Sequence, residues 1–420
     1  MPALATAPAP TATALPAAPA AVPAKLWRPV VFAAITAILV LFTAASSTPS
    51  PLYVVYQQQW QFSPTTLTVV FAIYVLGLLG SLLVFGALSD HLGRRPVLAA
   101  AIALEALALV LFIVAGSVTT LAVARLAQGI ATGAAITTLG AALVDLNPPH
   151  APGRAGLVNG VGALGGLALG ALGCGALVQF APAPTHLVYA LLLGGMLLAA
   201  IVVARMPETS TRRAGALASL QPRVGIPARL RPDVYALVPI IVASWALGGL
   251  YLSLGPSVAA SLFGLHSHLV GGLVVTMLCG TGAATAFLLR TWPTAKLLTL
   301  AAVLLAAGMV VTLAGVEASS AVLAAGGTLV AGVGFGAAAL GTFGALALLA
   351  APHERGELLA VAYVISYLAF SLPAVAAGFA STSYGLRPTA VVYGVGVVVL
   401  GVAALAAQRV LATRRGVATA

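Results

Sequence analysis

Three polar side chains inside long apolar segments are the residues of this sequence best placed to do chemistry. Arg125 and Gln128 fall within one apolar run, and Glu105 is the single acid deep within another. An ionisable group inside a bilayer is costly and by default marks a functional site. A helical rise of about 1.5 Å per residue places Arg125 and Glu105 at overlapping depths. Two interpretations of these residues are open: a static ion pair between Arg125 and Glu105, or a proton relay through Glu105.

A polar decapeptide, Gly86–Arg95, interrupts a chain in which only 6% of residues are charged. It reads Gly-Ala-Leu-Ser-Asp-His-Leu-Gly-Arg-Arg and lies between two apolar runs. Gly86 and Gly93 permit a tight turn. Asp90 is suited to interact with the N-terminus of another helix, whose free N–H groups and positive dipole end attract a carboxylate.

The two arginines of this decapeptide have two possible roles. Arg94 or Arg95 can pair with Asp145, which ends a later apolar run. Such contacts would hold a gate closed between two parts of the molecule. Alternatively, the arginines act only as topology determinants.

Composition predicts an all-α membrane protein. The 420 residues are 61% hydrophobic, whereas soluble domains carry roughly 25% charged residues. Apolar runs of about 20 residues, long enough to cross a bilayer as helices, recur along the chain. Twelve are predicted, at about 29–48, 67–86, 97–116, 119–143, 156–180, 187–205, 234–254, 268–289, 297–316, 319–349, 358–380 and 388–409. Pro49 and Pro51 are expected to end the first of them.

The distribution of basic residues predicts the orientation. With a cytoplasmic N-terminus, 17 of the 19 Lys and Arg residues fall on the cytoplasmic side, Arg387 falls outside and Arg125 lies within a span. This asymmetry follows the positive-inside rule. The net charge of +11 therefore reflects the orientation of the chain in the membrane, and nothing in the sequence indicates nucleic-acid binding. Both termini are expected in the cytoplasm.

The chain is predicted to divide into two six-helix halves. An Ala/Pro-rich tail is expected over 1–28, the halves over 29–205 and 234–409, a cytoplasmic linker over 206–233 and a cytoplasmic tail over 410–420. Gly129-Ile-Ala-Thr-Gly133 recurs as Gly332-Val-Gly-Phe-Gly336, at an offset shared by two Pro-His pairs. Two halves related by a parallel repeat are typical of transporters with a substrate site near the midplane.

Two of these motifs resemble signatures of the major facilitator superfamily. The decapeptide is similar to the loop that joins the second and third spans in that family, and Arg125-Leu-Ala-Gln128-Gly129 is similar to its Arg-x-x-Gln-Gly motif. The resemblance covers residues 29–409. It implies that Asp90 contacts the eleventh helix, near residue 356, and that Arg125 influences proton exchange or substrate binding.

A weaker resemblance lies in the fifth span. Gly162, Gly166 and Gly170 follow the glycine spacing of a motif found in proton-coupled drug exporters, but Leu167 and Ala171 replace its Pro and final Gly. Small residues at this spacing let helices approach closely. The motif therefore favours export, and ordinary helix packing is the alternative.

The resemblance also implies a cavity lined by spans one, four, seven and ten, with two, five, eight and eleven beside them. Few formal charges and several aromatic residues suit a neutral or cationic amphiphile. The candidate cavity residues are Thr43, Ser46, Tyr74, Asn159, Trp245, Tyr251, Phe335, Tyr363 and Tyr367.

These observations predict a secondary active transporter, a proton-coupled exporter or antiporter of small amphipathic compounds that works by alternating access. It is expected to be a monomer in the bacterial plasma (inner) membrane, without cofactor or metal. An uptake or metabolite carrier on the same scaffold is the alternative. A membrane enzyme or a channel is more distant, because no nucleophile constellation, metal-ligand set or selectivity filter is visible. The first and seventh spans contain no acid, which leaves the coupling residue open.

Overall fold

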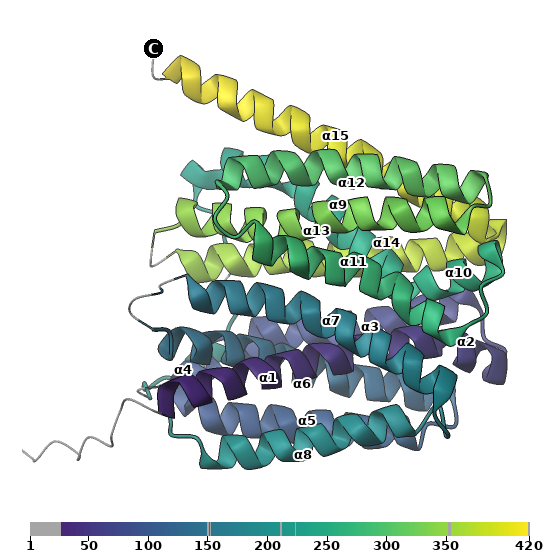
Figure 1. Ribbon diagram of the computed structural model, residues 1–420. Helices are drawn as coiled ribbons and strands as arrows, with labels where there is room; N and C mark the ends of the chain where they lie inside the picture. Colours follow the sequence, from purple (N-terminus) through teal and green to yellow (C-terminus); the bar gives the residue numbers. More distant parts are fainter. Residues whose placement is uncertain are drawn as a thin grey trace, which may run out of the picture.

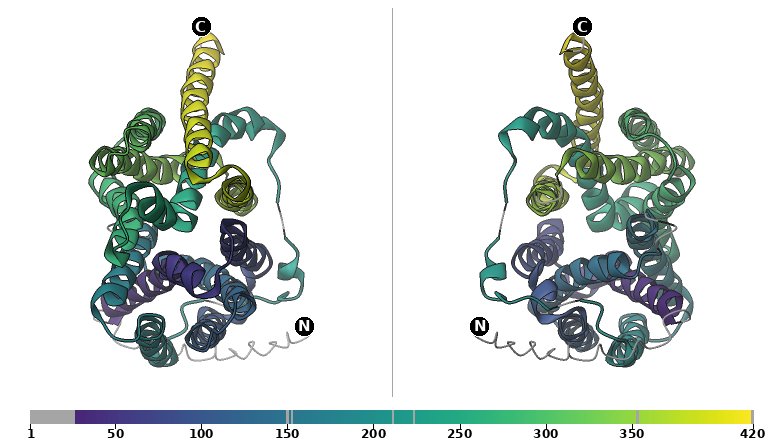
Figure 2. Two further views of the ribbon diagram at one scale, coloured as in Figure 1. Left: turned by 90° about the vertical axis from the view of Figure 1, so that its right-hand side faces the viewer. Right: turned by 90° about the vertical axis from the view of Figure 1, so that its left-hand side faces the viewer.

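The computed structural model describes residues 27–148, 151, 153–210, 212–222, 224–351 and 354–418. Within these residues the chain is helical, with no β-strand. Twelve helical segments are long and apolar enough to cross a membrane. They pack side by side in two bundles, one from the N-terminal part of the chain and one from the C-terminal part (Figures 1 and 2). The predicted fold class is confirmed.

The helices of the N-terminal half are α1 (Trp27–Ser47), α2 (Pro49–Trp60), α3 (Pro64–Phe85), α4 (Leu88–Leu92), α5 (Arg94–Ile113), α6 (Val118–Asp145), α7 (Arg154–Phe180) and α8 (Leu187–Arg205). The linker contains two short 3-10 turns, η1 (Ala218–Leu220) and η2 (Ala228–Leu230). The C-terminal half contains α9 (Arg231–Ser253), α10 (Gly255–Phe263), α11 (His268–Leu288), α12 (Thr294–Glu317), α13 (Ala321–Leu349), α14 (Arg355–Tyr384) and α15 (Leu386–Ala418).

The first span is longer than the sequence suggests. Pro49 and Pro51 do not end it, because they occupy the first turn of α2, where proline is tolerated. The span therefore continues to Trp60 after a break at Thr48. The predicted N-terminal tail lies outside the described residues except for Trp27 and Arg28, which begin α1, and α15 continues as a helix to Ala418.

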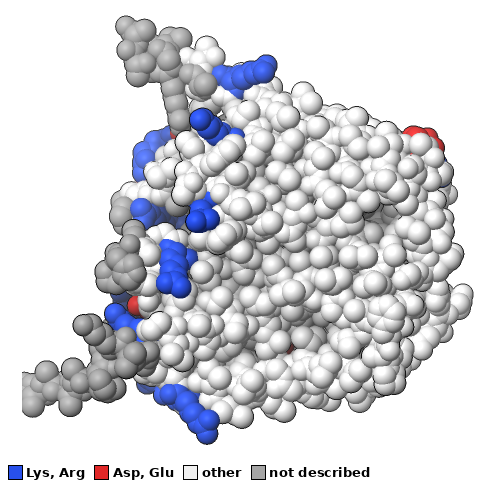
Figure 3. Space-filling view, viewed as in Figure 1, with Lys and Arg blue, Asp and Glu red and all other residues white. Residues whose placement is uncertain are grey.

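Basic side chains gather at one end of the bundle, which we call the basic end (Figure 3). It carries the starts of α5, α7 and α14 and the end of α8. The other end, which we call the opposite end, carries α2 and α10 (Figure 1). The linker passes from one half to the other outside the bundle (Figure 2).

The repeated glycine motif has the same packing role in both halves. A Cβ at Gly129 or Gly133 would collide with backbone oxygens of α3, at Tyr74 and Leu78. A Cβ at Gly336 would likewise collide with the Gly282 carbonyl of α11. The motif therefore lets α6 cross α3 closely, and α13 cross α11, at equivalent places in the two halves.

Hydrogen bonds between the helices of the two halves lie, among the described residues, at the opposite end or near mid-depth. Ser50 donates to the Leu252 carbonyl at 2.6 Å, and Thr276 donates to the Ala168 carbonyl at 3.0 Å. Thr65 contacts the Thr382 hydroxyl at 2.9 Å.

Gln179 makes the most specific of these contacts. Its side-chain oxygen accepts from the Ser267 hydroxyl at 3.1 Å and from the His268 backbone N–H at 3.0 Å. This amide from α7 therefore caps the N-terminus of α11, which belongs to the other half. Within the part of the chain that the structure describes, the hydrogen bonds between the halves at this end are formed by uncharged groups.

The fifth-span glycines lie where α7 crosses α1. A Cβ at Gly170 would collide with the Ala44 carbonyl and the Ser47 hydroxyl, and one at Gly166 would collide with Thr43. The contact at Gly162 is looser, because a Cβ there would lie 3.3 Å from the Leu39 side chain. Close packing of α7 on α1 thus depends mainly on two of the three positions.

We predict that Gly170→Ala lowers the apparent melting temperature in detergent, because overpacking costs about 1–3 kcal/mol. Gly173→Ala is the matched control on the same helix, since its Cβ would meet no atom within 4 Å. Equal melting temperatures for the two variants would contradict the close crossing.

Candidate functional site

Arg125 is buried in the centre of the N-terminal half, 1% exposed, and its guanidinium is surrounded by acceptors. Nε and Nη2 both donate to the Tyr53 hydroxyl, at 2.8 and 2.5 Å. Nη1 donates to the Ser46 carbonyl at 3.0 Å and to Gln128 Oε1 at 2.7 Å. The arginine therefore faces inward and does not extend to the membrane surface.

The break between α1 and α2 supplies some of these acceptors. Pro49 has no N–H, so the Ala45 carbonyl lacks its usual helical donor four residues on. Gln128 Nε2 donates to this carbonyl at 3.1 Å, and Arg125 binds the next one, at Ser46. A freed carbonyl inside a membrane protein needs such a partner. The α6 motif therefore stabilises the broken first span.

Gln128 also connects Arg125 with Glu105. Its Nε2 donates to Glu105 Oε1 at 3.0 Å, while its Oε1 accepts from Arg125. Arg125 and Glu105 are not among the ion pairs of the described residues, so the direct pair considered from the sequence is replaced by a bridge. The geometric reason is that the guanidinium is already occupied by Tyr53 and by the carbonyl of the α1–α2 break.

Glu105 is fully buried, and its Oε2 has no hydrogen-bond partner. A carboxylate oxygen left unpaired away from water is costly when charged. A proton on Oε2 would remove this charge. When the proton leaves, the positive charge of Arg125, which the Gln128 amide connects to Glu105, would balance the negative charge of the carboxylate. A protonated Glu105 therefore fits this buried arrangement, whereas release of the proton needs a path to water.

Tyr53 is a site residue that sequence reasoning missed. Besides accepting from Arg125, its ring lies under the guanidinium, 5.4 Å from Cζ to the ring centroid. Tyr74 contributes a second ring at 4.9 Å. The signal that could have found Tyr53 is the Pro49/Pro51 pair, because prolines spaced this way can begin a helix as well as end one.

The decapeptide forms a second polar cluster, at the basic end. Arg94 is buried and pairs with Asp90 at 2.6 Å and with Asp145 at 3.0 Å. It also donates to the Ser89 hydroxyl at 2.7 Å. The structure thus contains the expected Arg94–Asp145 pair. Arg95 instead donates to the Ala204 carbonyl, at the end of α8.

Among the described residues, no hydrogen bond or ion pair joins the Asp90 side chain to the eleventh span. Its carboxylate binds Arg94 within the loop, and the residue before α14, Glu354, provides no side-chain cap. Glu354 instead pairs with Arg229 of the linker. The expected contact of Asp90 with α14 is therefore absent from this conformation, in which the helices of the two halves are hydrogen-bonded at the opposite end and at mid-depth.

Glu208, just beyond α8, holds the start of α5 and was not expected to do so. Its carboxylate accepts from the backbone N–H of Arg94 at 2.7 Å and of Arg95 at 3.1 Å. Gly93 adopts φ +104°, and a Cβ there would lie 2.5 Å from Glu208 Oε2. Gly93 is therefore required both for the turn and for the approach of Glu208, whereas Gly86 has an ordinary helical φ of −55°.

The environment of Glu208 favours its ionised form. Partial burial opposes ionisation, but N–H groups of Ser210, Arg94, Arg95 and Thr209 together hold the pKa of Glu208 below its usual value. A helix N-terminus with its free N–H groups accounts for this direction. The carboxylate thus remains charged at neutral pH.

The candidate cavity residues separate into two groups. Thr43 and Ser46 are buried and donate to carbonyls of their own helix, and Tyr74 covers Arg125. Tyr251 is buried against Thr328 inside the C-terminal half. These four belong to packed interiors. The remaining five lie elsewhere, at less buried or interfacial positions: Asn159, Trp245, Phe335, Tyr363 and Tyr367.

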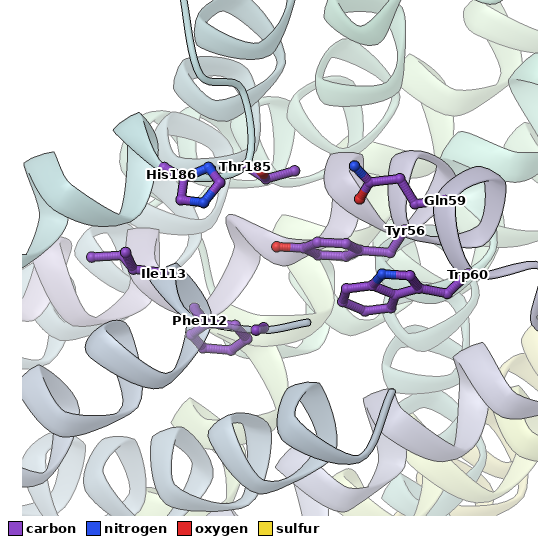
Figure 4. A pocket seen from close by; sticks show the side chains of 8 residues that line it. Tyr56, Gln59, Trp60, Phe112, Ile113, Thr185 and His186 are labelled. Carbon is purple, nitrogen blue, oxygen red and sulfur yellow. Dashed lines mark hydrogen bonds between the residues drawn. The ribbon is translucent and has the colours of Figure 1, made fainter. Parts of the chain in front are cut away.

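A cavity of about 260 Å³ lies beside the Arg125 cluster at the opposite end, between α2, α5 and the start of α8 (Figure 4). Tyr56 and Trp60 stack at 4.8 Å along one wall, and Tyr56 reaches the Tyr189 hydroxyl at 3.4 Å. Thr185 and His186 lie on the other side. The cavity begins at Tyr56, one turn beyond Tyr53 on α2. No group of three or more metal-binding side chains occurs among the described residues.

We predict that Tyr53→Phe destabilises the protein by about 1–3 kcal/mol, because two buried donors of Arg125 lose their acceptor. The apparent melting temperature of the purified protein measures the effect. Tyr235→Phe makes the same chemical change at a side chain on α9 that is 59% exposed. A loss no larger than that of the control would show that Arg125 does not depend on Tyr53.

We predict a pH-dependent effect for Glu208→Gln. Because the pKa of Glu208 is lowered in the folded protein, its stabilisation is present above the ordinary pKa of a glutamate and disappears as pH falls through the folded value. The variant should melt earlier than wild type at neutral pH and equally at strongly acidic pH. Glu317→Gln, at an exposed acid, is the control. A difference that persists unchanged in acid would contradict the role of the charge.

Comparisons with known proteins agree with this architecture. Residues 34–374 match the family described as the Major Facilitator Superfamily. Among solved structures, a bacterial homolog of the human lysosomal transporter Spinster, in an inward-facing and unoccupied conformation, is similar with TM-score 0.71 and 14% identity over 92% of this chain and 98% of that one.

Two further solved structures show the same fold. The xylose transporter XylE from E. coli, in an inward-open conformation, has TM-score 0.70 and 14% identity over 90% of this chain and 96% of its own. The human organic anion transporter MFSD10 (TETRAN) has TM-score 0.65 and 18% identity over 90% and 99%. No curated protein matches the chain.

Proposed function

Because the chain belongs to the major facilitator superfamily, it is a multi-pass membrane transporter of small molecules and not an enzyme, and we propose that it exports small amphipathic compounds in exchange for protons. The observation that carries the proposal is the bridge from Arg125 through Gln128 to the unpaired Oε2 of Glu105. Glu105 is the proton-binding residue in this account.

The proposed orientation places the basic end in the cytoplasm, together with both termini. The gathering of Lys and Arg at that end supports it (Figure 3). The hydrogen bonds between the helices of the halves then lie mostly on the extracellular side, as expected of an inward-facing state. The similarity to structures described as inward-facing and inward-open is consistent with this state.

Alternating access then follows from the two polar clusters. In the inward-facing state the neutral contacts of Gln179, Ser50 and Thr65 join the halves outside. In the outward-facing state Asp90, released from this arrangement, would cap α14 at the cytoplasmic end. Glu105 is closed to water in the present state, so proton exchange requires the conformational change or a water path opened by the break in the first span.

The export direction is supported by the spacing of the fifth-span glycines, and the scarcity of charge in the spans supports an amphipathic substrate. An uptake carrier would be built on the same scaffold. Inverted vesicles distinguish the two, because an exporter moves compounds into their interior. Compounds for this assay come from a resistance screen of strains that overproduce the protein.

We predict that Glu105→Gln abolishes proton coupling without unfolding the protein. In energised inverted vesicles, adding a transported compound should partly collapse the acid interior with wild type, read as recovery of acridine orange fluorescence. The variant should give no recovery, because glutamine cannot bind a proton on this oxygen. Glu317→Gln, at the exposed end of α12, should behave as wild type.

Full fluorescence recovery by the Glu105→Gln variant would overturn the assignment of the coupling residue. Wild-type transport at the same rate with and without a pH gradient would overturn the proposal of proton exchange.

A further inference from the structure

One face of α14 carries a continuous aromatic stripe. Tyr363, Ser366, Tyr367 and Phe370 follow the spacing i, i+3, i+4 and i+7, which places all four on the same side of the helix. The Tyr363 and Tyr367 rings are nearly parallel, with centroids 6.2 Å apart.

Aromatic residues from neighbouring helices extend this stripe. Trp245 of α9 meets Tyr367 edge-on at 5.0 Å and Phe370 at 5.8 Å. Phe343 of α13 contacts Tyr363 at 5.4 Å. We call the five rings of Trp245, Phe343, Tyr363, Tyr367 and Phe370 the aromatic ladder.

The ladder lies along the seam between the halves. Phe370 contacts Phe71 of the N-terminal half at 5.1 Å, and Tyr367 and Phe370 belong to the same buried cluster as the residues of that half. Phe370 and Tyr367 are buried, whereas Trp245, Phe343 and Tyr363 keep part of their surface open. The exposed ring surface of the ladder therefore increases along α14 from Phe370, at the contact with the N-terminal half, toward Tyr363, which is nearer the basic end.

An unpaired polar atom lies within the ladder. Ser366 is 1% exposed, and its hydroxyl has no hydrogen-bond partner. Serines on membrane helices commonly bond a carbonyl one turn back, as Ser371 on the same helix does at 2.9 Å. A buried hydroxyl that bonds nothing is unusual and calls for a partner from outside the protein chain.

The ladder belongs to the C-terminal half and contains no charged side chain. In the N-terminal half, Asn159 Oδ1 also lacks a partner, whereas the Arg125–Gln128–Glu105 bridge is buried in the interior of that half. The ladder is therefore an apolar, aromatic surface that is separate from the buried polar bridge.

We propose that the aromatic ladder binds a planar aromatic ring of the substrate by stacking, with the Ser366 hydroxyl bonded to a polar atom on that ring. The inference rests on the proposed function, in that the seam is the transport path, and it narrows the substrate class from amphipathic compounds to aromatic ones. Offset stacking and edge contacts favour such ligands over aliphatic ones of equal size.

Fluorescence of Trp245 reports on this site directly. Trp27→Phe, Trp60→Phe and Trp292→Phe together leave Trp245 as the single tryptophan. Acridine, a planar probe that absorbs tryptophan emission, should quench this fluorescence saturably in the purified protein. The neutral pair 2-naphthol and decahydro-2-naphthol then competes with acridine. The aromatic member should displace it, and the saturated member should not at the same concentration.

Substitutions in the ladder test the residues. Tyr363→Leu should weaken acridine binding about three- to tenfold, the range expected for one lost aromatic contact. Ser366→Ala should weaken 2-naphthol binding about three- to tenfold, as for one lost hydrogen bond. Tyr235→Leu, at an exposed tyrosine on α9, should change neither. Ser366→Ala removes one atom, so it keeps the test valid if the tyrosine variant does not fold.

Three results would overturn the proposal: no saturable quenching by acridine, equal displacement by the saturated alcohol, or unchanged binding in the Ser366→Ala variant. The measurement is made at equilibrium without a pH gradient, so it is independent of proton coupling. Intact acridine binding without proton coupling would count against the proposed function alone. Intact proton coupling without acridine binding would count against the ladder alone.

Discussion

The burial of one arginine constrains much of the N-terminal half. Arg125 carries a charge in the interior of the bundle, and such a charge is tolerated only when its donors are all directed at acceptors. The acceptors come from the tyrosine of α2, the glutamine one turn along α6 and a carbonyl at the break of the first span. Pro49 frees the Ala45 carbonyl, which accepts from Gln128 and so holds the amide that bonds the buried arginine. The same network orients Gln128 toward Glu105 and leaves one carboxylate oxygen unpaired.

The two ends of the molecule are held by different kinds of interaction. At the opposite end, neutral hydrogen bonds and closely packed small residues join the two halves, with Gly272 against the Ala171 carbonyl and Gly378 against Thr68. At the basic end, charged side chains act within each half and its adjoining linker, through Arg94 with Asp145 and Arg229 with Glu354. Neutral contacts break without leaving a buried charge behind. In the proposed orientation, this difference suits an outer gate that opens during transport and an inner cluster that keeps its shape.

Periodicity and charge distribution were sufficient to predict twelve spans and their order, because apolar length and loop charge act locally. The Arg94–Asp145 pair also followed from the sequence. The roles of Tyr53 and Glu208 did not, since each acts on a helix far along the chain and only the folded bundle brings them together. The expected contact between Asp90 and α14 concerns a different conformation, and a sequence does not specify which state a structure captures. The bridging by Gln128 was missed because depth along a helix gives no rotation about its axis.

The central claim is that Glu105, which Gln128 links to Arg125, binds the proton that is exchanged for substrate. The most direct measurement is the proton release that accompanies substrate binding, followed with a pH indicator dye in weakly buffered, detergent-purified protein. Linkage requires that a ligand favouring the deprotonated state displace a proton. The account predicts release by wild type and none by Glu105→Gln, with binding retained in both. Equal proton release by the two proteins, or none by wild type on saturating binding, would contradict it.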